Sequence, residues 1–391
     1  MTDPRSPYLF DVDLERFWQD DAASQGKAFG TDKPQVPLGI SLPVTCLWEE
    51  LGEPTPSWAD TEVHDPYLVE ADLRKRYNDK AERLIGQRSF PEATERPDAP
   101  RFPEVKGITD LFEAPTHYAG GTGWVMPAAR TPRELEALLD RVERRDPREV
   151  LFPADWEPQV KRVYEQWGVR PQLGGGVRGP ITAAMSLYGV ENLIFLLVDT
   201  PDLAAHFRDV LADQIIAMTR LLLLESGAPD RRGFGFADDN CAMLNAELYA
   251  FFGQPILRRV FETFAPDPGD TRYQHSDSAM GHLMPLLNEV GLNGANFGPT
   301  VAAADIRAAL PRCVIHGQLA PWTFARGTDA EVAAEVRRDL EAVGADGGLI
   351  VATAGSINPG SRLSGLRAIM STIQQYGRYQ KRCASPDPRD R

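Results

Sequence analysis

The sequence lacks the features that define several large classes of protein. Its cysteines are few and far apart, at Cys46, Cys241, Cys313 and Cys383, and none forms a CxxC pair. That spacing excludes a zinc knuckle and a redox dithiol. Scattered free thiols are typical of a reducing compartment, and the polar N-terminus does not resemble a secretory signal, so we expect a cytoplasmic protein. No apolar run approaches the ~18 residues of a membrane span, so no membrane association is expected.

Positive charge is also scarce relative to negative charge. The 391 residues include 42 Lys and Arg against 56 Asp and Glu, which gives a formal net charge of −14. Nucleic-acid binders usually present a basic face, so this balance argues against a nucleic-acid partner. Hydrophobic residues make up 42% of the chain, enough for a sizeable core. The composition therefore favours a globular protein that does not bind nucleic acid.

Residues 1–130 are irregular in pattern and rich in proline. One helix is predicted there, from about Pro66 to Ile85. This part contains large aromatic side chains, such as Trp18, Trp48 and Phe102, whose apolar surface is expected to be buried. We therefore predict an N-terminal extension that packs on the rest of the chain. A Gly120–Trp124 segment near its end is either a lid hinge or a flexible connection.

From Thr131 the pattern changes to alternating helices and strands. Helices are predicted to begin at four capping positions: Thr131-Pro132, Thr200-Pro201, Asn245, and Thr328 with Glu331. The helix that begins at Thr200-Pro201 is expected to end near Gly227, and the helix that begins at Thr328 is expected to end at Gly344. The strand-like runs between them are Gln172–Gly176, Arg232–Ala237, Thr271–His275, Gly294–Phe297, Cys313–Leu319 and Gly348–Ala354.

This alternation predicts a parallel sheet. A (β/α)8 TIM-type barrel over residues 131–384 is favoured over an open doubly wound sheet, because no GxGxxG turn occurs and the repeat is even. Residues 385–391 are predicted to form a frayed tail.

Polar side chains follow nearly every predicted strand. They include Asp238, Asp239, His275, Asp277, Asn296, His316, Gln318 and Ser356. In a barrel the carboxyl ends of the strands carry the active site, so these residues are expected to converge. His275 is the strongest candidate among the histidines and His316 the second. For Asp238 and Asp239 alone, helix capping is an equally good explanation. Gly174-Gly175-Gly176 before Arg178 favours a tight turn over an anion cradle.

The chain from about Trp124 to Tyr379 resembles the uroporphyrinogen decarboxylase family, which also contains methyltransferases acting on corrinoids and thiols. The matching stretches are Gly179-Pro180-Ile181-Thr182, Asp238-Asp239, His275 to Gly281, Gly291 to Asn296, Gly317 to Pro321, Gly347-Gly348, Asn358-Pro359-Gly360 and Tyr376 to Tyr379. The resemblance implies a barrel enzyme and a divergent member of the family.

Two motifs of that family are missing here. The arginine-rich RQAGR-type motif, whose planar guanidinium groups would grip the carboxylates of a tetrapyrrole, does not occur. The thiol methyltransferases carry a His-x-Cys zinc motif and a distant cysteine. Here those positions read His275-Ser276-Asp277 and Ala354. The resemblance therefore implies neither tetrapyrrole binding nor a sulfur-rich zinc site.

A third pattern of similar methyltransferases is retained in spacing. O-demethylating enzymes of this fold hold zinc through Glu-x14-Glu-x20-His, and Asp239, Gln254 and His275 stand at the same spacing. Asp277 would restore the charge that Gln254 loses. This implies zinc or another divalent metal held by Asp239, Gln254, His275 and Asp277. A metal-free polar pocket built from the same residues is left open.

Three functions follow from these patterns. The leading one is a metal-assisted methyltransferase or demethylase in which Asp238 or His316 handles the proton, Asn296 assists catalysis, and the substrate contacts are Arg178, Gln318, Ser356 and Trp124. The alternative is a decarboxylase with Asp238 as the acid and Arg178 or Arg272 seating a carboxylate. The third is a binding barrel with a decayed site. A corrinoid-carrying partner is implied only by the resemblance, and a homodimer is left open.

Overall fold

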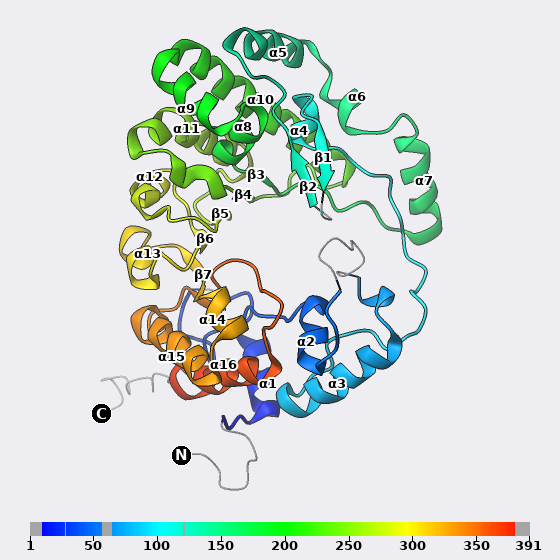
Figure 1. Ribbon diagram of the computed structural model, residues 1–391, viewed down its shortest axis with the longest axis vertical. Helices are drawn as coiled ribbons and strands as arrows, with labels where there is room; N and C mark the ends of the chain where they lie inside the picture. Colours follow the sequence, from blue (N-terminus) through cyan, green and yellow to red (C-terminus); the bar gives the residue numbers. More distant parts are fainter. Residues whose placement is uncertain (1–9, 28, 57–64, 120–121, 380–391) are drawn as a thin grey trace, which may run out of the picture.

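A computed structural model describes residues 10–27, 29–56, 65–119 and 122–379. Its centre is a parallel sheet with the strand order β3-β4-β5-β6-β7-β8 (Figure 1). The strands are β3 Gly176–Arg178, β4 Phe234–Ala237, β5 Arg272–Ser276, β6 Gly294–Phe297, β7 Val314–Leu319 and β8 Leu349–Thr353. Sequential order with parallel pairing is the topology of a β/α barrel. The predicted tail, Cys383, and Gly120 and Gly121 of the predicted hinge segment lie outside the described residues.

The helices between these strands cover the outer face of the sheet, whereas α5, α6 and α7 precede β3 and α16 follows β8 (Figure 1). Those of the β/α part are α5 Pro132–Arg144, α6 Pro147–Leu151, α7 Trp156–Trp167, α8 Pro180–Tyr188, α9 Val190–Asp199, α10 Pro201–Glu225, α11 Ala246–Phe264, α12 Met284–Glu289, α13 Ala303–Ala309, α14 Pro321–Arg326, α15 Asp329–Asp339 and α16 Leu363–Tyr376. The N-terminal part contains α1 Leu14–Ser24, α2 Leu47–Leu51, α3 Ala71–Ile85, α4 Ile108–Leu111 and a hairpin of β1 Thr116–Ala119 and β2 Thr122–Val125.

Most of the expected element boundaries agree with this structure. Thr131 accepts a hydrogen bond from the Glu134 amide at the start of α5, and Thr328 and Glu331 form the capping box of α15. Thr200 differs, because its side chain makes no capping bond to α10. Gly344 also differs. It ends a short π-helical turn, Leu340–Gly344, that follows α15.

The expected strand Gln172–Gly176 overlaps β3 only at Gly176. Gly174 and Gly175 have φ values of 77° and 97°, which glycine adopts without strain, so they form the turn that precedes the strand. The expected helix from Pro66 to Ile85 is also divided. A short 3-10 turn, Pro66–Leu68, precedes α3.

The N-terminal part supplies a strand-like segment to the barrel. The Gly39 amide donates to the carbonyl of Val351 in β8 at 2.8 Å, and the Val351 amide donates to Pro37 at 2.9 Å. Leu38 thus pairs with Val351 in parallel. A side chain at Gly39 would collide with Ile350 at 2.7 Å, so glycine allows this close approach. Residues 37–39, which lie in the predicted N-terminal extension, therefore contact the sheet at its β8 edge.

The sheet edge opposite to this segment is β3. Within the described residues, no strand is hydrogen-bonded to β3 on its far side, and β1 pairs with β2 alone. Among the described residues, the parallel sheet thus has six strands, β3 to β8, and residues 37–39 add one parallel bridge at its β8 edge.

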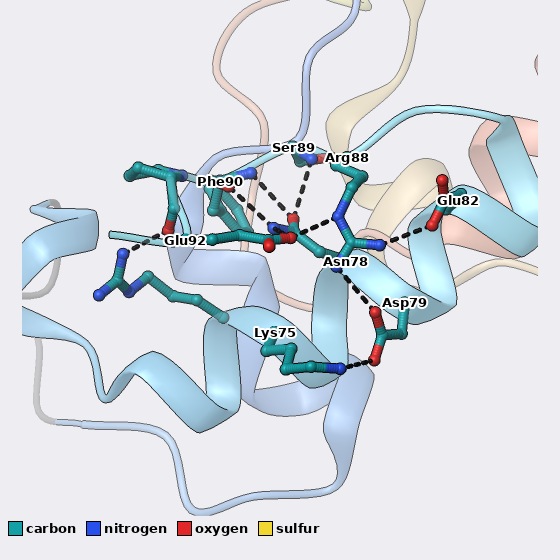
Figure 2. Close-up of polar contacts among 10 residues, drawn as sticks. Lys75, Asn78, Asp79, Glu82, Arg88, Ser89, Phe90 and Glu92 are labelled. Carbon is teal, nitrogen blue, oxygen red and sulfur yellow. Dashed lines mark hydrogen bonds and ion pairs between the residues drawn. The ribbon is translucent and has the colours of Figure 1, made fainter. Parts of the chain in front are cut away.

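A network of charges holds the segment after α3 against that helix (Figure 2). The Arg88 guanidinium contacts the carboxylates of Asp79, Glu82 and Glu92. The buried Asn78 accepts hydrogen bonds from the amides of Ser89 and Phe90 at 3.0 Å each. These contacts explain how a segment with few regular elements keeps one conformation, since its backbone groups find partners on α3.

No single helix among the described residues is long and apolar enough to cross a bilayer. Helices α8 and α9 reach that length and composition only when taken together, and they are bent by 103° at the break between them.

Candidate functional site

Strand β5 places His275 inside the barrel. Side chains alternate between the two faces of a strand, and Gln274 and Ser276 are completely buried on the outer face, toward the helices. His275 therefore projects into the interior. The strand register pairs it with Ala237 of β4 on one side and with Asn296 of β6 on the other. Arg178 of β3 pairs with Ala237, so Arg178 and Asn296 lie at the level of His275.

Asn296 fixes both the orientation and the tautomer of His275. The Asn296 Nδ2 group donates to the backbone carbonyls of His316 and Thr353, the latter at 2.8 Å. Its Oδ1 must therefore accept, and it lies 2.8 Å from Nδ1 of His275. A proton on Nδ1 leaves the lone pair of Nε2 free in the neutral ring. This is the arrangement by which proteins orient a metal-binding histidine.

Two carboxylates face the free nitrogen of His275. Oδ1 of Asp277 lies 3.4 Å and Oδ1 of Asp239 lies 3.8 Å from Nε2. The same oxygen of Asp239 accepts a hydrogen bond from the Asp277 amide at 2.8 Å, which ties the loop after β4 to the loop after β5. One ligand atom from each of the three residues lies within 4.8 Å of the others. We call Asp239, His275 and Asp277 the His275 cluster.

The loop after β8 forms one side of the His275 cluster. A Cβ atom at Gly355 would lie 2.3 Å from Oδ1 of Asp277, and Gly355 has a φ of 110°. Only glycine satisfies both conditions, so this position is part of the site although it offers no functional group. Burial raises the pKa of Asp277, with the His275 charge acting in the opposite direction and the Asp239 charge in the same one.

Asp238 does not belong to the His275 cluster. Its side chain is completely buried and accepts hydrogen bonds from the amide and hydroxyl of Thr182, at 2.8 and 2.9 Å, and from the Ile181 amide. It thus holds the first turn of α8, and Gly179 is required because a Cβ there would overlap Asp238 at 2.2 Å. Burial raises the pKa of Asp238 to about 6. The expected catalytic role gives way to a structural one, because the carboxylate is enclosed by its own donors.

Gln254 also lies away from the His275 cluster. It projects from α11 toward α12, where its Nε2 donates to the Leu286 carbonyl at 3.0 Å and to Glu289 at 2.8 Å. The spacing that suggested a shared metal site therefore brings together Asp239 and His275, while the third residue faces a helix. Asp277, two residues beyond His275, occupies the place that the spacing gave to Gln254.

The other expected site residues are distributed over several regions. Gln318 is buried and donates to Gly298 and Val301, so it braces the loop after β6 rather than facing the interior. His316 lines a cavity at the amino ends of the strands. Ser356 is exposed in the loop after β8, and Trp124 is exposed on the β1–β2 hairpin. Arg178 is exposed and donates to the Ser186 hydroxyl at 3.2 Å.

Cysteine does not contribute to the His275 cluster in the part of the chain that the structure describes. Cys241 lies two residues beyond Asp239, but its sulfur faces the hydroxyl of Ser276 on the outer side of β5, at 3.6 Å. Burial raises the pKa of Cys241 to about 12, so the group stays a thiol at neutral pH. The donor set at the carboxyl ends is accordingly one nitrogen and carboxylate oxygens.

A β/α barrel with an oriented histidine and two acids at the carboxyl ends of its strands has the architecture of a barrel enzyme. The family model for uroporphyrinogen decarboxylase (URO-D) matches residues 119–376, more than half of the chain. The protein belongs to the uroporphyrinogen decarboxylase family, as a divergent member. This assignment confirms the barrel fold that the sequence predicted.

A solved structure, described as a methyltransferase from Methanosarcina mazei, shares this fold. The similarity has a TM-score of 0.55 and 15% sequence identity, and it covers 91% of this chain and 98% of the other. Among functionally curated proteins, no significant sequence match is found. The coverage extends the common fold beyond the family match to most of the N-terminal part.

Proposed function

We propose that the protein is a metal-assisted methyltransferase or demethylase that acts on a small molecule, with zinc or another divalent cation held by the His275 cluster. The observation that carries the proposal is the convergence of Nε2 of His275 with oxygens of Asp239 and Asp277 within 4.8 Å. One imidazole and two carboxylates, with further positions left for substrate, suit a cation that acts as a Lewis acid.

Three features of the His275 cluster fit a cation. The hydrogen bond to Asn296 leaves the Nε2 lone pair of His275 pointing at both acids. Burial raises the pKa of Asp277 and the nearby Asp239 carboxylate adds to this, so a cation between the two acids would stabilise their charged forms. The amide of Asp277 holds Asp239 in place before any ligand arrives. Preorganised ligands of this kind reduce the ordering that binding requires.

A bound cation would polarise the heteroatom of the substrate and lower its pKa. The methyl group then passes as a CH3+ equivalent: the bonding electron pair stays with the donor atom, and the acceptor atom forms the new bond with its own lone pair. The acceptor must lose its proton. We assign that proton to the outer oxygen of Asp239, whose side chain is 48% exposed. The sequence also suggested Asp238 and His316 for this step. The Asp238 amide donates to the His275 carbonyl at 2.9 Å, but its carboxylate faces Ile181 and Thr182. The His316 ring lies against Tyr273 in the cavity at the amino ends of the strands.

The methyl donor that suits the proposal is a corrinoid on a partner protein. A large carrier requires that the reacting groups be reachable from outside. The side chains of Asp239 and Asp277 are about half exposed, at 48% and 51%. The loops at the carboxyl ends of the strands would therefore form the docking face for that partner.

A decarboxylase is the second candidate, and Arg178 is the observation that favours it. Arg178 ends β3 and pairs with Ala237, the register partner of His275, and its exposed guanidinium makes one hydrogen bond, to the Ser186 hydroxyl. Its remaining donors could pair with a carboxylate. Arg272, the other expected cation, is not available, because it donates to the backbone carbonyls of Ala265 and Val290.

A methyl-transfer assay on metal-loaded protein tests the proposal. Purified protein is treated with a chelator, reloaded with Zn²⁺, and mixed with methylcobalamin and either a small thiol or a phenol as acceptor. Loss of the methyl group is followed by visible absorption, and the methylated product by mass spectrometry. We expect transfer that requires Zn²⁺ and is lost in His275→Ala. The matched control is His206→Ala, a surface histidine on α10 that contacts Glu143.

Transfer that is equal in the chelated protein and in His275→Ala would exclude the metal-assisted reaction. Release of CO2 from a carboxylated substrate without any methyl acceptor, together with its loss in Arg178→Gln, would favour the decarboxylase.

A further inference from the structure

A cavity of about 600 Å³ lies at the opposite end of the barrel from the His275 cluster. Its lining includes Thr271, Asn293 and Arg312, which lie just before the first residues of β5, β6 and β7, respectively. The cavity is therefore at the amino ends of the strands. None of Asp239, His275 and Asp277 contributes to its lining. Its size is that of pockets which enclose small organic ligands.

Glycines in the sheet leave room for the Tyr273 ring, which lines this cavity. Barrel interiors are normally filled by layers of branched side chains. Here Gly235 and Gly294 occupy inward positions on either side of Tyr273, and Cβ atoms built on them would lie 3.3 and 3.0 Å from its ring. The Tyr273 ring thus lies across two strands without side chains, and its neighbour His316 meets it edge to face at 5.7 Å between ring centres.

The N-terminal part provides another wall. Phe29 lines the cavity and forms an antiparallel bridge with Gly347, just before β8. Phe29 as a whole residue is 43% exposed. Pro37 and Ile350 line the cavity beside it. The lining is thus aromatic and aliphatic on its sides, with flat glycine backbone between them, a combination that suits a planar apolar ligand.

Three polar groups at this cavity have no partner of their own. Within the described residues, the side chains of Tyr273, Arg312 and His316 make no hydrogen bond or ion pair. Burial lowers the pKa of His316, so its ring is neutral at neutral pH and can both donate and accept. Arg312 is exposed in the turn before β7 and carries the charge. Arg272, which also lines the cavity, is already saturated by backbone carbonyls.

We propose that this cavity is a second binding site, which takes a small planar aromatic carboxylate. The ring of the ligand packs against Tyr273 and Phe29, and its carboxylate pairs with Arg312 at the open side. His316 and the Tyr273 hydroxyl provide hydrogen bonds to any polar substituent on the ring. This site is independent of the proposed methyl transfer, because it shares no residue with the His275 cluster.

Calorimetric titration with 2-naphthoate, and with its neutral isostere 2-naphthamide, tests the proposal on the full-length protein. We expect one molecule of 2-naphthoate per chain, and an affinity for 2-naphthamide at least about tenfold lower, since one ion pair is missing. Arg312→Gln should reduce the affinity for 2-naphthoate to that for 2-naphthamide and leave the amide unaffected. Val314→Phe, which narrows the cavity, should weaken both ligands by more than about tenfold.

The controls separate this cavity from the rest of the surface. Arg133→Gln removes an exposed arginine on α5, and His275→Ala disrupts the cluster at the other end; both should bind 2-naphthoate within about twofold of the unaltered protein. The proposal is overturned if 2-naphthoate does not bind, if Arg312→Gln leaves its affinity unchanged, or if His275→Ala abolishes binding. The Arg312 comparison concerns a surface residue, so it holds even if Val314→Phe fails to fold.

Discussion

The two ends of the barrel interior are built from the same strands and carry opposite chemistry. On β5, Tyr273 and His275 project from the same face two residues apart, about 7 Å along the strand. At the carboxyl end, His275 meets the acids Asp239 and Asp277. At the amino end, the Tyr273 ring contacts the His316 ring, and Arg312 lines the open side of the cavity. The alternation of side chains along the strand thus determines which residues point into the barrel. The position of such a residue along the strand determines at which end of the interior it lies.

The difference teaches that a cavity and a reactive cluster need not coincide. The cavity at the amino end is lined by none of the three residues of the His275 cluster, whose acids lie on loops at the carboxyl end. In β/α barrels the carboxyl-end loops vary without disturbing the sheet, whereas the amino end contributes stability. The predictions below disturb one end at a time.

The largest effect on stability is expected when the buried carboxylate of Asp238, which holds the first turn of α8, is removed. Asp238→Ala leaves the amides of Ile181 and Thr182 buried without an acceptor, so the free energy of unfolding should fall by about 3 kcal/mol or more. Urea denaturation measures this. Asp230→Ala, in an exposed turn, is the matched control and should change stability by less than about 0.5 kcal/mol. A loss in Asp238→Ala no greater than in the control would refute the structural role given to this carboxylate.

The next effect concerns the orientation of His275. Asn296→Leu removes the acceptor at Nδ1, and Zn²⁺ affinity should fall by about 10- to 100-fold, as it does when such partners of a metal-bound histidine are lost. Competition with a chromophoric chelator measures the affinity. The same variant must be shown to be folded by its unfolding curve. Unchanged affinity in a folded Asn296→Leu protein would mean that Asn296 does not control the histidine.

A smaller effect should distinguish the two histidines of the interior. His316→Phe keeps an aromatic ring against Tyr273 and removes both ring nitrogens. Because His316 lines the amino-end cavity, Zn²⁺ affinity should stay within about twofold, whereas His275→Ala should abolish it. Loss of Zn²⁺ binding in His316→Phe would show that the two ends are not separate.

The smallest effect concerns the contact that holds the N-terminal segment at β8. Oδ1 of Asp21 accepts from the Leu38 amide at 2.8 Å, and burial raises the pKa of Asp21 despite this bond and that from Gln25. A folded pKa above the unfolded one stabilises the fold at low pH. That contribution is fully present below the unfolded pKa of 3.8 and is lost as the pH rises through the raised value.

The side chain introduced in the Asp21→Asn variant cannot ionise, so the variant should lose less stability between about pH 4 and pH 7 than the unaltered protein does. The difference between the two losses should be below about 1 kcal/mol, because solvent screens this site. Urea midpoints at the two pH values check this. An equal change in urea midpoint between the two pH values in both proteins would show that Asp21 keeps an ordinary pKa.

Much of the fold was predictable from the sequence, because each strand is a short apolar run between capped helices. The position of β3 was predicted less well. The sequence favoured a tight turn for the glycine run but placed the strand at Gln172–Gly176, before that turn, whereas Gly174 and Gly175, with positive φ values, precede the strand. The contribution of residues 37–39 to the sheet was missed. That segment is isolated in a proline-rich region, and its partner lies more than 300 residues away.

The His275 cluster was predicted in part. Spacing along the chain indicates which strand end a residue follows, and this brought His275, Asp239 and Asp277 together. Spacing does not reveal which way a helix turns its side chains, so Gln254 was assigned to a site that it faces away from. Asp238 was indistinguishable from Asp239 in sequence, yet one is enclosed by donors and the other is exposed.

Calorimetric titration of Zn²⁺ into chelator-treated protein tests the central claim most directly. The account predicts one Zn²⁺ per chain in the unaltered protein and in His206→Ala, and a loss of at least about 100-fold in affinity in a folded His275→Ala variant. Absence of Zn²⁺ binding to the unaltered protein, or equal binding by His275→Ala, would contradict it.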